Sequence, residues 1–521
     1  MLDIISHLGT GFAACFHPVT MLMLISGIVI GLLVGVLPGL TLVMGVVLFL
    51  PFTYKMDVTT SIVLLTAMYV SGTYGGAFTS ILFRIPGEPI HVPLLWDGYA
   101  MARQGHAAKA LGWTLIAALA GGLISAVIMV ALTKPVASFA LRFSSPEFFA
   151  ILLFGLASVI SLGKGAMSKA LISLALGLLI ASVGTDSIYG AHRFTFGLPI
   201  LADGIEFLVV MVGAYGVAEV LARLERGFVS KPIGSVATTK TELPSLRDIG
   251  AVKGTLLRNA IIGNIIGLIP GAGATIASFI GYGVESQIGK NRAAMGSGTV
   301  EGIIAPQSAA TASVGGALVP LLALGIPGSG ATAVILGAFM LHGVQPGPQV
   351  LLTSSAMVYT IFASVFLGII VMCLLGYFAI RPLVKILDFP ESVVSAFVMI
   401  FCFIGALAIR SNVTDLWLMI GFGLLGYIFE RLTFPIAPLV LGVILGPLAE
   451  ESFMNSMISF SNDWTVFFTR PISGTIMAVI AVTLLLPFVS ALRARNTRST
   501  ARGTSTQVAT PSHGSASGGR A

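Results

Sequence analysis

Two long stretches of the chain carry no Asp, Glu, Lys or Arg: residues 4–54 and residues 302–380. A helix that crosses a bilayer needs about 20 consecutive apolar residues, so each stretch is long enough for more than one span. Over all 521 residues, 56% are hydrophobic and only 9% are charged. A soluble domain carries about 25% charged residues. The sequence therefore predicts an all-α polytopic membrane protein with roughly 12 transmembrane spans.

Two of the apolar segments are interrupted at their centres by proline and glycine. GLLVGVLPGLTL is interrupted at Pro38 and Gly39, and GNIIGLIPGAGATIASFIGYGVE at Pro270, Gly271 and Gly273. Proline removes a backbone donor and glycine adopts conformations that other residues avoid, so the helices should break here. Broken backbone at membrane depth is tolerated only where protein or a polar cavity surrounds it. Paired breaks of this kind indicate the binding site of a secondary transporter.

Three landmarks recur in the same order in the two halves of the chain, which predicts two internal repeats, each with broken helices or hairpins at its Pro-Gly motifs. The three pairs lie 232, 240 and 241 residues apart: Pro38-Gly39 with Pro270-Gly271, Gly75-Gly76 with Gly315-Gly316, and Ile85-Pro86-Gly87 with Ile326-Pro327-Gly328. An even or odd number of spans between them would make the repeats parallel or inverted, and the sequence leaves both open.

The polar residues divide the chain into four parts. Residues 1–222 form the first membrane half, residues 223–258 a linker rich in Lys and Arg, residues 259–491 the second membrane half, and residues 492–521 a disordered basic tail. Positive charge marks the cytoplasmic side of a membrane protein, so we expect the linker and the tail to be cytoplasmic.

The candidate substrate and ion site consists of the residues at the breaks and the hydroxyl, amide and guanidinium groups beside them. Exposed helix N-termini attract anions, whereas carbonyl and hydroxyl oxygens coordinate cations, so such a site suits a carboxylate carried with Na⁺ or H⁺. The candidates are Pro38, Gly39, Thr41, Ser71, Thr73, Gly75, Gly76, Arg84, Pro86, Gly87, Pro270, Gly271, Gly273, Thr275, Gln307, Thr311, Gly315, Gly316, Pro327, Gly328 and Ser329.

Each of these assignments has a structural alternative. A hydroxyl in an apolar helix often bonds back to its own helix, and this holds also for Ser278, Ser308 and Ser313. Arg84 could pair with a substrate carboxylate or lie at the interface. For Glu285 and Glu301 we expect the side chain to extend to the interface.

Other chemistries find no support in the sequence. Cys15, Cys373 and Cys402 are scattered through apolar stretches, so neither a disulfide framework nor a metal site is expected. HExxH, GxSxG and P-loop patterns are missing, so the chain is not expected to be an enzyme, and transport by this chain is not expected to use ATP or a cofactor. The net charge of +7 lies largely in loops and the tail, and no nucleic-acid partner is predicted.

At these motifs the chain resembles the large permease subunit of the tripartite tricarboxylate transporters, the TctA family. The resemblance covers about residues 20–450 and rests on GLLVGVLPGL, LPFTY, YGGAFTSIL, PGEP, DGYAMARQG, GLIPGAGATIASFIGYGVE, EGIIAP, GGALVPLLALGIPGS and LLTSSAMVYTIFAS. It implies a multi-pass permease of the bacterial cytoplasmic membrane. The partners that it implies are a small four-helix membrane subunit and a periplasmic solute-binding protein that delivers a carboxylate, with uptake driven by an ion gradient.

The chain also departs from the family pattern. Arg84 and Ile85 precede Pro86-Gly87, where the family has Asn, and Ser286 replaces a Lys. Gln307, Ala310 and Thr311 stand where the family has Glu and paired Asn. A substrate other than citrate, or altered ion coupling, is the hypothesis that follows. A stand-alone ion-coupled carboxylate carrier and a structural membrane protein that transports nothing remain the alternatives.

Overall fold

The computed structural model describes residues 2–37, 40–161, 167–186, 188–227, 241–271, 273–378 and 391–482. Over these residues the chain is helical, apart from its connections and one hairpin in which β1 (Gly184–Thr185) pairs antiparallel with β2 (His192–Arg193). Eight of the described helical segments are long and apolar enough to cross a membrane, and six shorter apolar helices accompany them. The predicted all-helical membrane fold is confirmed, whereas the number of about twelve spans and the division into two internal repeats stay predictions.

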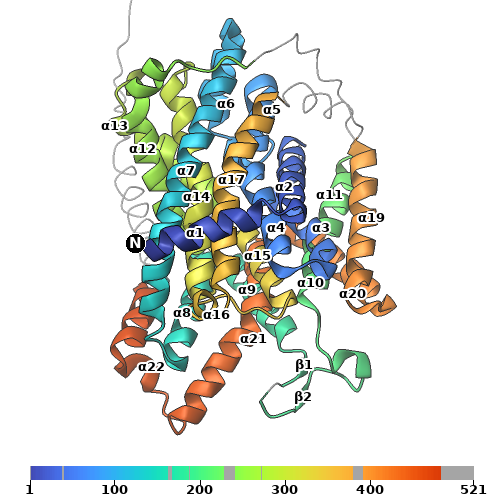
Figure 1. Cartoon of the computed structure of the whole chain (residues 1–521). Coiled ribbons are helices and arrows are strands. Elements are labelled where there is room, and N and C mark those ends of the chain that lie inside the picture. The colour runs from blue at the N-terminus through green and yellow to red at the C-terminus, as the bar shows by residue number, and fades with distance from the viewer. Residues whose placement is uncertain are drawn as a thin grey trace, which may run out of the picture.

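The first half starts with a helix that lies across the body of the molecule in Figure 1. Its elements are α1 (Leu2–Cys15), α2 (Pro18–Val36), α3 (Leu42–Phe49), η1 (Leu50–Lys55), α4 (Val58–Gly75), α5 (Ala77–Phe83), η2 (Pro89–His91) and α6 (Leu94–Met101). Helix α2 ends before the first predicted break and α3 begins after it, but Pro38 and Gly39 themselves lie outside the described residues.

The middle of the chain contains the longest helix and the hairpin. Its elements are η3 (Ala102–His106), α7 (Ala107–Ala140), α8 (Ser145–Ser161), α9 (Met167–Ala181), β1, β2, η4 (Pro199–Leu201), α10 (Phe207–Met211), η5 (Val212–Val217) and α11 (Ala218–Arg226). The polar stretch 223–258 is helical at both of its ends, because α11 runs to Arg226 and the next helix begins at Leu246. Ser245 and Asp248 form a capping box there, which fixes that start.

The second half also contains an interrupted helix. Its elements are α12 (Leu246–Leu268), α13 (Gly273–Ile288), η6 (Arg292–Ala294), α14 (Val300–Leu324), α15 (Gly330–Leu341), α16 (Val350–Thr353) and α17 (Ser355–Phe378). The predicted break is confirmed: α12 ends at Leu268, and Gly271 and Gly273 have φ values of 82° and 61°. Glycine adopts this left-handed region without the steric cost that a Cβ would bring.

The C-terminal helices pack beside this core. They are α19 (Glu391–Arg410), α20 (Val413–Arg431), α21 (Ile436–Ser459) and α22 (Val466–Thr469), followed by an apolar helix over Pro471–Val482. Helix α21 packs against α8 and α9, and α20 packs against η5. The tail predicted to be disordered, residues 492–521, lies outside the described residues.

Helices α4 and α14 form the centre of the molecule. The span that contains α4 is 100% buried inside the protein and that of α14 is 94% buried, whereas only 28% of α20 is buried. Both central helices are rich in hydroxyl and glycine residues. The hydroxyl groups would be costly against lipid and are instead surrounded by protein. Helix α7 packs along α14, and α17 packs against both α4 and α7 (Figure 1).

Glycines bring α2 onto α4, and α12 onto α14, at backbone contact distance. A Cβ on Gly75 would lie 2.6 Å from the carbonyl oxygen of Leu32 and 3.0 Å from the Cα of Gly35. A Cβ on Gly316 would lie 2.5 Å from the carbonyl oxygen of Asn264 and 3.1 Å from the Cα of Gly267. Such close approach is typical of small residues at helix interfaces in membranes.

The residues in these two contacts lie at two spacings along the chain, one for each helix of the pair. Leu32 and Gly35 lie 232 residues before Asn264 and Gly267, while Gly75 lies 241 residues before Gly316. The spacing agrees with that of the first and third landmark pairs. It corrects the second, because Gly75 corresponds in its contacts to Gly316 and not to Gly315, which packs against Ser125 of α7. In so glycine-rich a sequence, the backbone contacts and not the residue types decide the register.

Candidate functional site

The two central helices meet at a buried polar group. Gln307 of α14 donates from Nε2 to the carbonyl oxygen of Thr73 of α4 at 3.1 Å, and to Oγ1 of Thr311 at 3.0 Å. The Nε2 atom of His91, in η2, contacts the same Thr73 oxygen at 3.0 Å. All four residues are at most 1% exposed. The group therefore joins residues from the two halves of the chain in the interior.

Two buried atoms of this group lack a partner. His91 Nδ1 and Gln307 Oε1 receive no hydrogen bond from any described residue. Because a carbonyl oxygen only accepts, Nε2 of His91 carries the proton, and Nδ1 is an acceptor. An unpaired buried acceptor costs about 1–3 kcal/mol, so such atoms often mark a place where a ligand or an ion completes the structure.

A second polar group lies one turn earlier on α4. The hydroxyl of Tyr69 lies 3.1 Å from that of Ser329, which caps α15 together with Thr332. The carboxyl of Glu88 lies close enough to Tyr69 to act on its phenol electrostatically, and Glu88 itself is 6% exposed. Glu88 is the fourth residue of the sequence IPGE, and Ser329 holds the same place in IPGS.

The Pro-Gly segments bring these groups together. The N–H of Gly271 donates to the carbonyl oxygen of Gly328 at 3.1 Å, which ties the break of α12 to the connection before α15. Ser278 of α13 donates to the carbonyl oxygen of Ile90 at 2.7 Å, which ties α13 to the first half. Non-helical backbone from both halves thus lies inside the protein. This is the place where it is tolerated, because its unpaired backbone groups would be costly against lipid.

The structure places several predicted site residues at or beside this centre: Thr73, Gly87, Gly271, Gly273, Gln307, Thr311, Pro327, Gly328 and Ser329. Gly87 packs against Gly35 and Gly76, and Gly328 packs in the same way against Gly267 and Ala317. These glycines admit the connections between the helix pairs because no side chain occupies the contact.

Other candidates lie elsewhere. Thr41 is exposed and caps α3 through Met44 N. The Ser71 hydroxyl donates to the Ala67 carbonyl of its own helix at 2.8 Å, and that of Thr73 donates to Val70 at 2.7 Å, as the structural alternative predicts. Pro86 and Thr275 are partly exposed. Gly75, Gly76, Gly315 and Gly316 form helix contacts, and Pro270 lies buried in the break.

The prediction that Glu285 and Glu301 extend to the interface is wrong. Glu285 is 0% exposed and accepts from Arg258, Thr255 and Asn259 of α12. Glu301 is 9% exposed and accepts from Asn291 at 2.6 Å. Partners from neighbouring segments replace water around both carboxylates, which the local sequence does not reveal.

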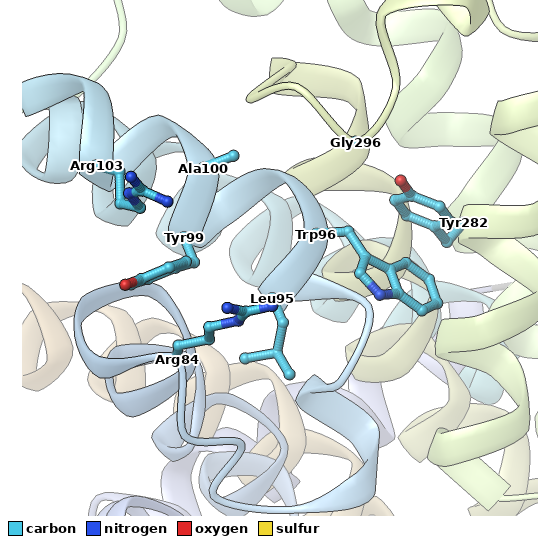
Figure 2. A pocket seen from close by; sticks show the side chains of 8 residues that line it. All are labelled: Arg84, Leu95, Trp96, Tyr99, Ala100, Arg103, Tyr282 and Gly296. Carbon is cyan, nitrogen blue, oxygen red and sulfur yellow. The ribbon is translucent and has the colours of Figure 1, made fainter.

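An outer pocket of about 530 Å³ lies near the centre, between the connection after α5, helix α6 and helix α13 (Figure 2). Arg84, Arg103, Trp96, Tyr99 and Tyr282 line it together with Leu95, Ala100 and Gly296. The Arg84 guanidinium lies 5.7 Å from the centre of the Tyr99 ring. Among the described residues neither arginine of the pocket has an ion-pair partner, so the pocket presents unneutralised positive charge.

A second polar cavity, of about 480 Å³, lies beside β1, β2 and α10. It also contains two arginines, but both are paired: Arg193 with Glu450 and Arg410 with Glu206. The positive charge there is neutralised by carboxylates of the protein. The outer pocket beside Arg84 is therefore the better place for an anion.

Asp97 of α6 joins the wall of the outer pocket to the second half. Its buried carboxylate accepts from Tyr282 Oη, Gly296 N, Gly298 N, Thr299 N and Thr299 Oγ1, at 2.7 to 3.0 Å. Four of these bonds hold the connection between η6 and α14 against α6, and the bond from Tyr282 ties α13 to the same carboxylate. Hydrogen bonds to a charged carboxylate are stronger than bonds between neutral groups, so Asp97 stabilises this contact between α6 and the second half.

Sequence reasoning omitted Tyr69 and His91 from the site. Both look like ordinary core residues, one inside an apolar helix and one in a connection. The available signal was the position of His91 and Glu88 directly after the first IPG motif, where broken backbone makes a polar side chain informative.

A family model described as the tripartite tricarboxylate transporter TctA family matches residues 21–441. An uncharacterized 52.8 kDa protein in the TAR-I ttuC' 3' region of Agrobacterium vitis is 36% identical over 495 residues, 95% of this chain and 98% of that protein. An uncharacterized protein in the TAR-II ttuC' 3' region of the same organism is 37% identical over 233 residues, 45% of this chain and 96% of that protein. No solved structure matches the chain.

Proposed function

Since the chain belongs to the tripartite tricarboxylate transporter TctA family, we propose that it is the large membrane subunit of a secondary transporter that imports an organic carboxylate with Na⁺ or H⁺. The observation that carries the proposal is the buried polar centre, in which Thr73 and His91 of the first half meet Gln307 of the second. Transporters of this class bind substrate between two halves, at broken helices.

The two halves are inverted repeats in this proposal. Along α4 and α5 the chain passes Thr73 and then Ile81, which packs against Gly98 of α6. Along α14 the contacts come in the opposite order. The chain first passes Gly302, which lies against Asp97 of α6, and then Gln307, which meets Thr73. In Figure 1, α5 lies in the upper part of the molecule and α15 in the lower part. Opposite directions about a shared centre support an inverted pair.

The outer pocket is the cytoplasmic opening of the site in this proposal. Basic residues gather where α7 and α12 begin, and Lys109 lies close enough to Asp248 to interact with it. Arg103 lies just before α7, and Arg247 and Lys253 lie in the first turns of α12. Excess Lys and Arg mark the cytoplasmic side, so Arg84 and Arg103 would meet the carboxylate on its way out.

The partners are those of the family: a small four-helix membrane subunit and a periplasmic solute-binding protein in a bacterial cytoplasmic membrane. Uptake of radiolabelled citrate and other carboxylates into proteoliposomes that contain all three proteins tests this assignment. Uptake that requires every component supports it. Uptake by this chain alone supports a stand-alone carrier, and a chain that transports nothing in any combination supports a structural role.

Gln307→Leu tests the centre. The variant removes the bond to Thr73 and the unpaired Oε1 acceptor while it keeps the side-chain size. We expect the KM for the carboxylate to rise about tenfold, because one hydrogen bond in a buried site is worth about 1–1.5 kcal/mol. The control is Gln287→Leu, which changes an exposed glutamine of α13 and should leave KM unchanged. Equal KM values for Gln307→Leu and Gln287→Leu would mean that Gln307 is not part of the site.

Arg84→Ala combined with Arg103→Ala tests the outer pocket. In inside-out membrane vesicles we expect the KM from the cytoplasmic face to rise about tenfold at low salt, because unpaired arginines concentrate anions near a cleft. The difference should shrink at high salt, where charges are screened. Arg292→Ala removes an exposed charge outside the pocket and serves as the control. A salt-independent effect would contradict the electrostatic role.

A further inference from the structure

Glu88 is a buried carboxyl group without a partner. It lies in the connection between the apolar segments Val58–Phe83 and Leu94–Ala140, outside both, and is 6% exposed. Its side chain forms no ion pair or hydrogen bond with any described residue. Burial raises the pKa of Glu88 to about 8. A charged carboxylate in such surroundings is costly, so the group holds a proton at neutral pH.

The groups around Glu88 do not neutralise a negative charge. From α4 the titratable neighbour is the phenol of Tyr69, and from α15 the neighbour is the uncharged Ser329. From η2 it is His91, in which burial lowers the pKa to about 4, so the ring is neutral. Helices α13 and α14 contact η2, which directly follows Glu88. Their polar side chains there are uncharged: Ser278 donates to the carbonyl oxygen of Ile90, and Gln307 shares the carbonyl oxygen of Thr73 with His91.

Arg84, the cation nearest to Glu88 in sequence, lies in the outer pocket and has no ion pair with Glu88. Arg84 is exposed, adopts a left-handed backbone conformation with φ of 60°, and lies over Tyr99 in the outer pocket (Figure 2). The connection from Arg84 to Glu88 thus has a charged guanidinium at the pocket wall and a protonated carboxyl group inside the protein.

We propose that Glu88 binds the coupling proton, so that this transporter imports its carboxylate with H⁺. The inference rests on the proposed function and names its coupling ion. An anionic substrate beside Tyr69 and Ser329 adds negative charge next to Glu88 and favours the protonated form. By linkage, a protonated Glu88 favours substrate binding by the same factor, which couples the two.

Sodium fits the described residues less well. Hard cations take several oxygen ligands at once. The hydroxyls of Tyr69 and Ser329 contact each other, and Ser329 also bonds with Thr332.

The experiment compares Glu88→Gln with the unchanged chain, each reconstituted with the small subunit and the binding protein. A glutamine resembles the protonated carboxyl but cannot release a proton. We expect at least a tenfold loss of citrate accumulation driven by a pH gradient, while exchange of labelled for unlabelled citrate continues. The unchanged chain should acidify the vesicle lumen when citrate enters, and its pH-driven uptake should fall as the external pH rises through about 8.

Glu301→Gln is the matched control, because Glu301 is also a buried carboxylate but is bonded to Asn291. It should retain pH-driven accumulation. If the Glu88→Gln protein does not assemble with its partners, Glu88→Asp is tested instead. Its uptake should persist, and the external pH at which uptake falls should be lower than that of the unchanged chain.

The proposal is overturned if Glu88→Gln accumulates citrate under a pH gradient as well as the unchanged chain does, if the Glu88→Asp limit does not move, or if only a Na⁺ gradient drives uptake. Each of these results leaves carboxylate transport itself intact. The proposed function fails in a different way, namely when the unchanged chain and its partners move no carboxylate under any gradient.

Discussion

Replacing Gly316 by alanine is expected to prevent α12 and α14 from reaching their observed contact. The added Cβ would lie 2.5 Å from the carbonyl oxygen of Asn264 and 3.0 Å from its Cα, and backbone atoms cannot give way as a side chain can. Overpacking of this kind costs about 1–3 kcal/mol or more. We expect a lower thermal midpoint in detergent and a loss of carboxylate uptake, measured by unfolding fluorescence and by uptake into proteoliposomes.

The control is Gly368→Ala in α17, where a Cβ meets no atom within 4 Å. Because alanine is the better helix former by about 1 kcal/mol, this variant should be as stable as the unchanged chain or more stable. Gly75→Ala should behave like Gly316→Ala, because its Cβ would lie 2.6 Å from the carbonyl oxygen of Leu32. If Gly316→Ala matched Gly368→Ala in stability, the close pairing of α12 and α14 would be refuted.

Asp97→Ala is expected to have the second large effect. It removes the acceptor of five hydrogen bonds and leaves the N–H groups of Gly296, Gly298 and Thr299 without their partner. Hydrogen bonds to charged groups are worth about 1.5–3 kcal/mol each and are not additive, so we expect a loss of about 3 kcal/mol or more. Thermal unfolding measures this loss, and protease sensitivity of residues 289–299 should increase with it.

Asp463→Ala is the matched control for Asp97. Asp463 also accepts bonds from a threonine, through the N and Oγ1 of Thr465, but it is exposed. We expect a change within about 1 kcal/mol, as for other exposed caps. Comparable losses from both substitutions would mean that Asp97 does not fasten the two halves to each other.

The helices and their breaks follow from the sequence because their causes are local. The uncharged stretch 302–380 predicts more than one span, and α17 (Ser355–Phe378) lies within it, since a long run of apolar residues is itself the signal for a span. Proline and glycine at positions 270, 271 and 273 predict the interruption before α13, since they change the backbone at that point. The polar character of α4 and α14 likewise indicates burial in protein.

Whether each acidic side chain is buried or exposed could not be predicted in this way. Glu285 resembles a residue at the end of a span, yet Arg258 of another helix pairs with it inside the protein. Arg84 and Glu88 are four residues apart in one connection, yet one lies in the outer pocket and the other in the interior. A carboxylate is stable at either place, and the partner supplied by the fold decides between them.

The sequence by itself determined that this chain is helical, lies in a membrane and breaks its helices at Pro-Gly motifs, because apolar length, proline and glycine act on the backbone where they stand. Only the tertiary structure decided that Gln307 meets Thr73 across 234 residues, that Gly75 packs on Leu32 and Gly316 on Asn264, and that Glu88 is buried without a partner. Those facts depend on distances between segments far apart in the chain, which no local pattern of residues encodes.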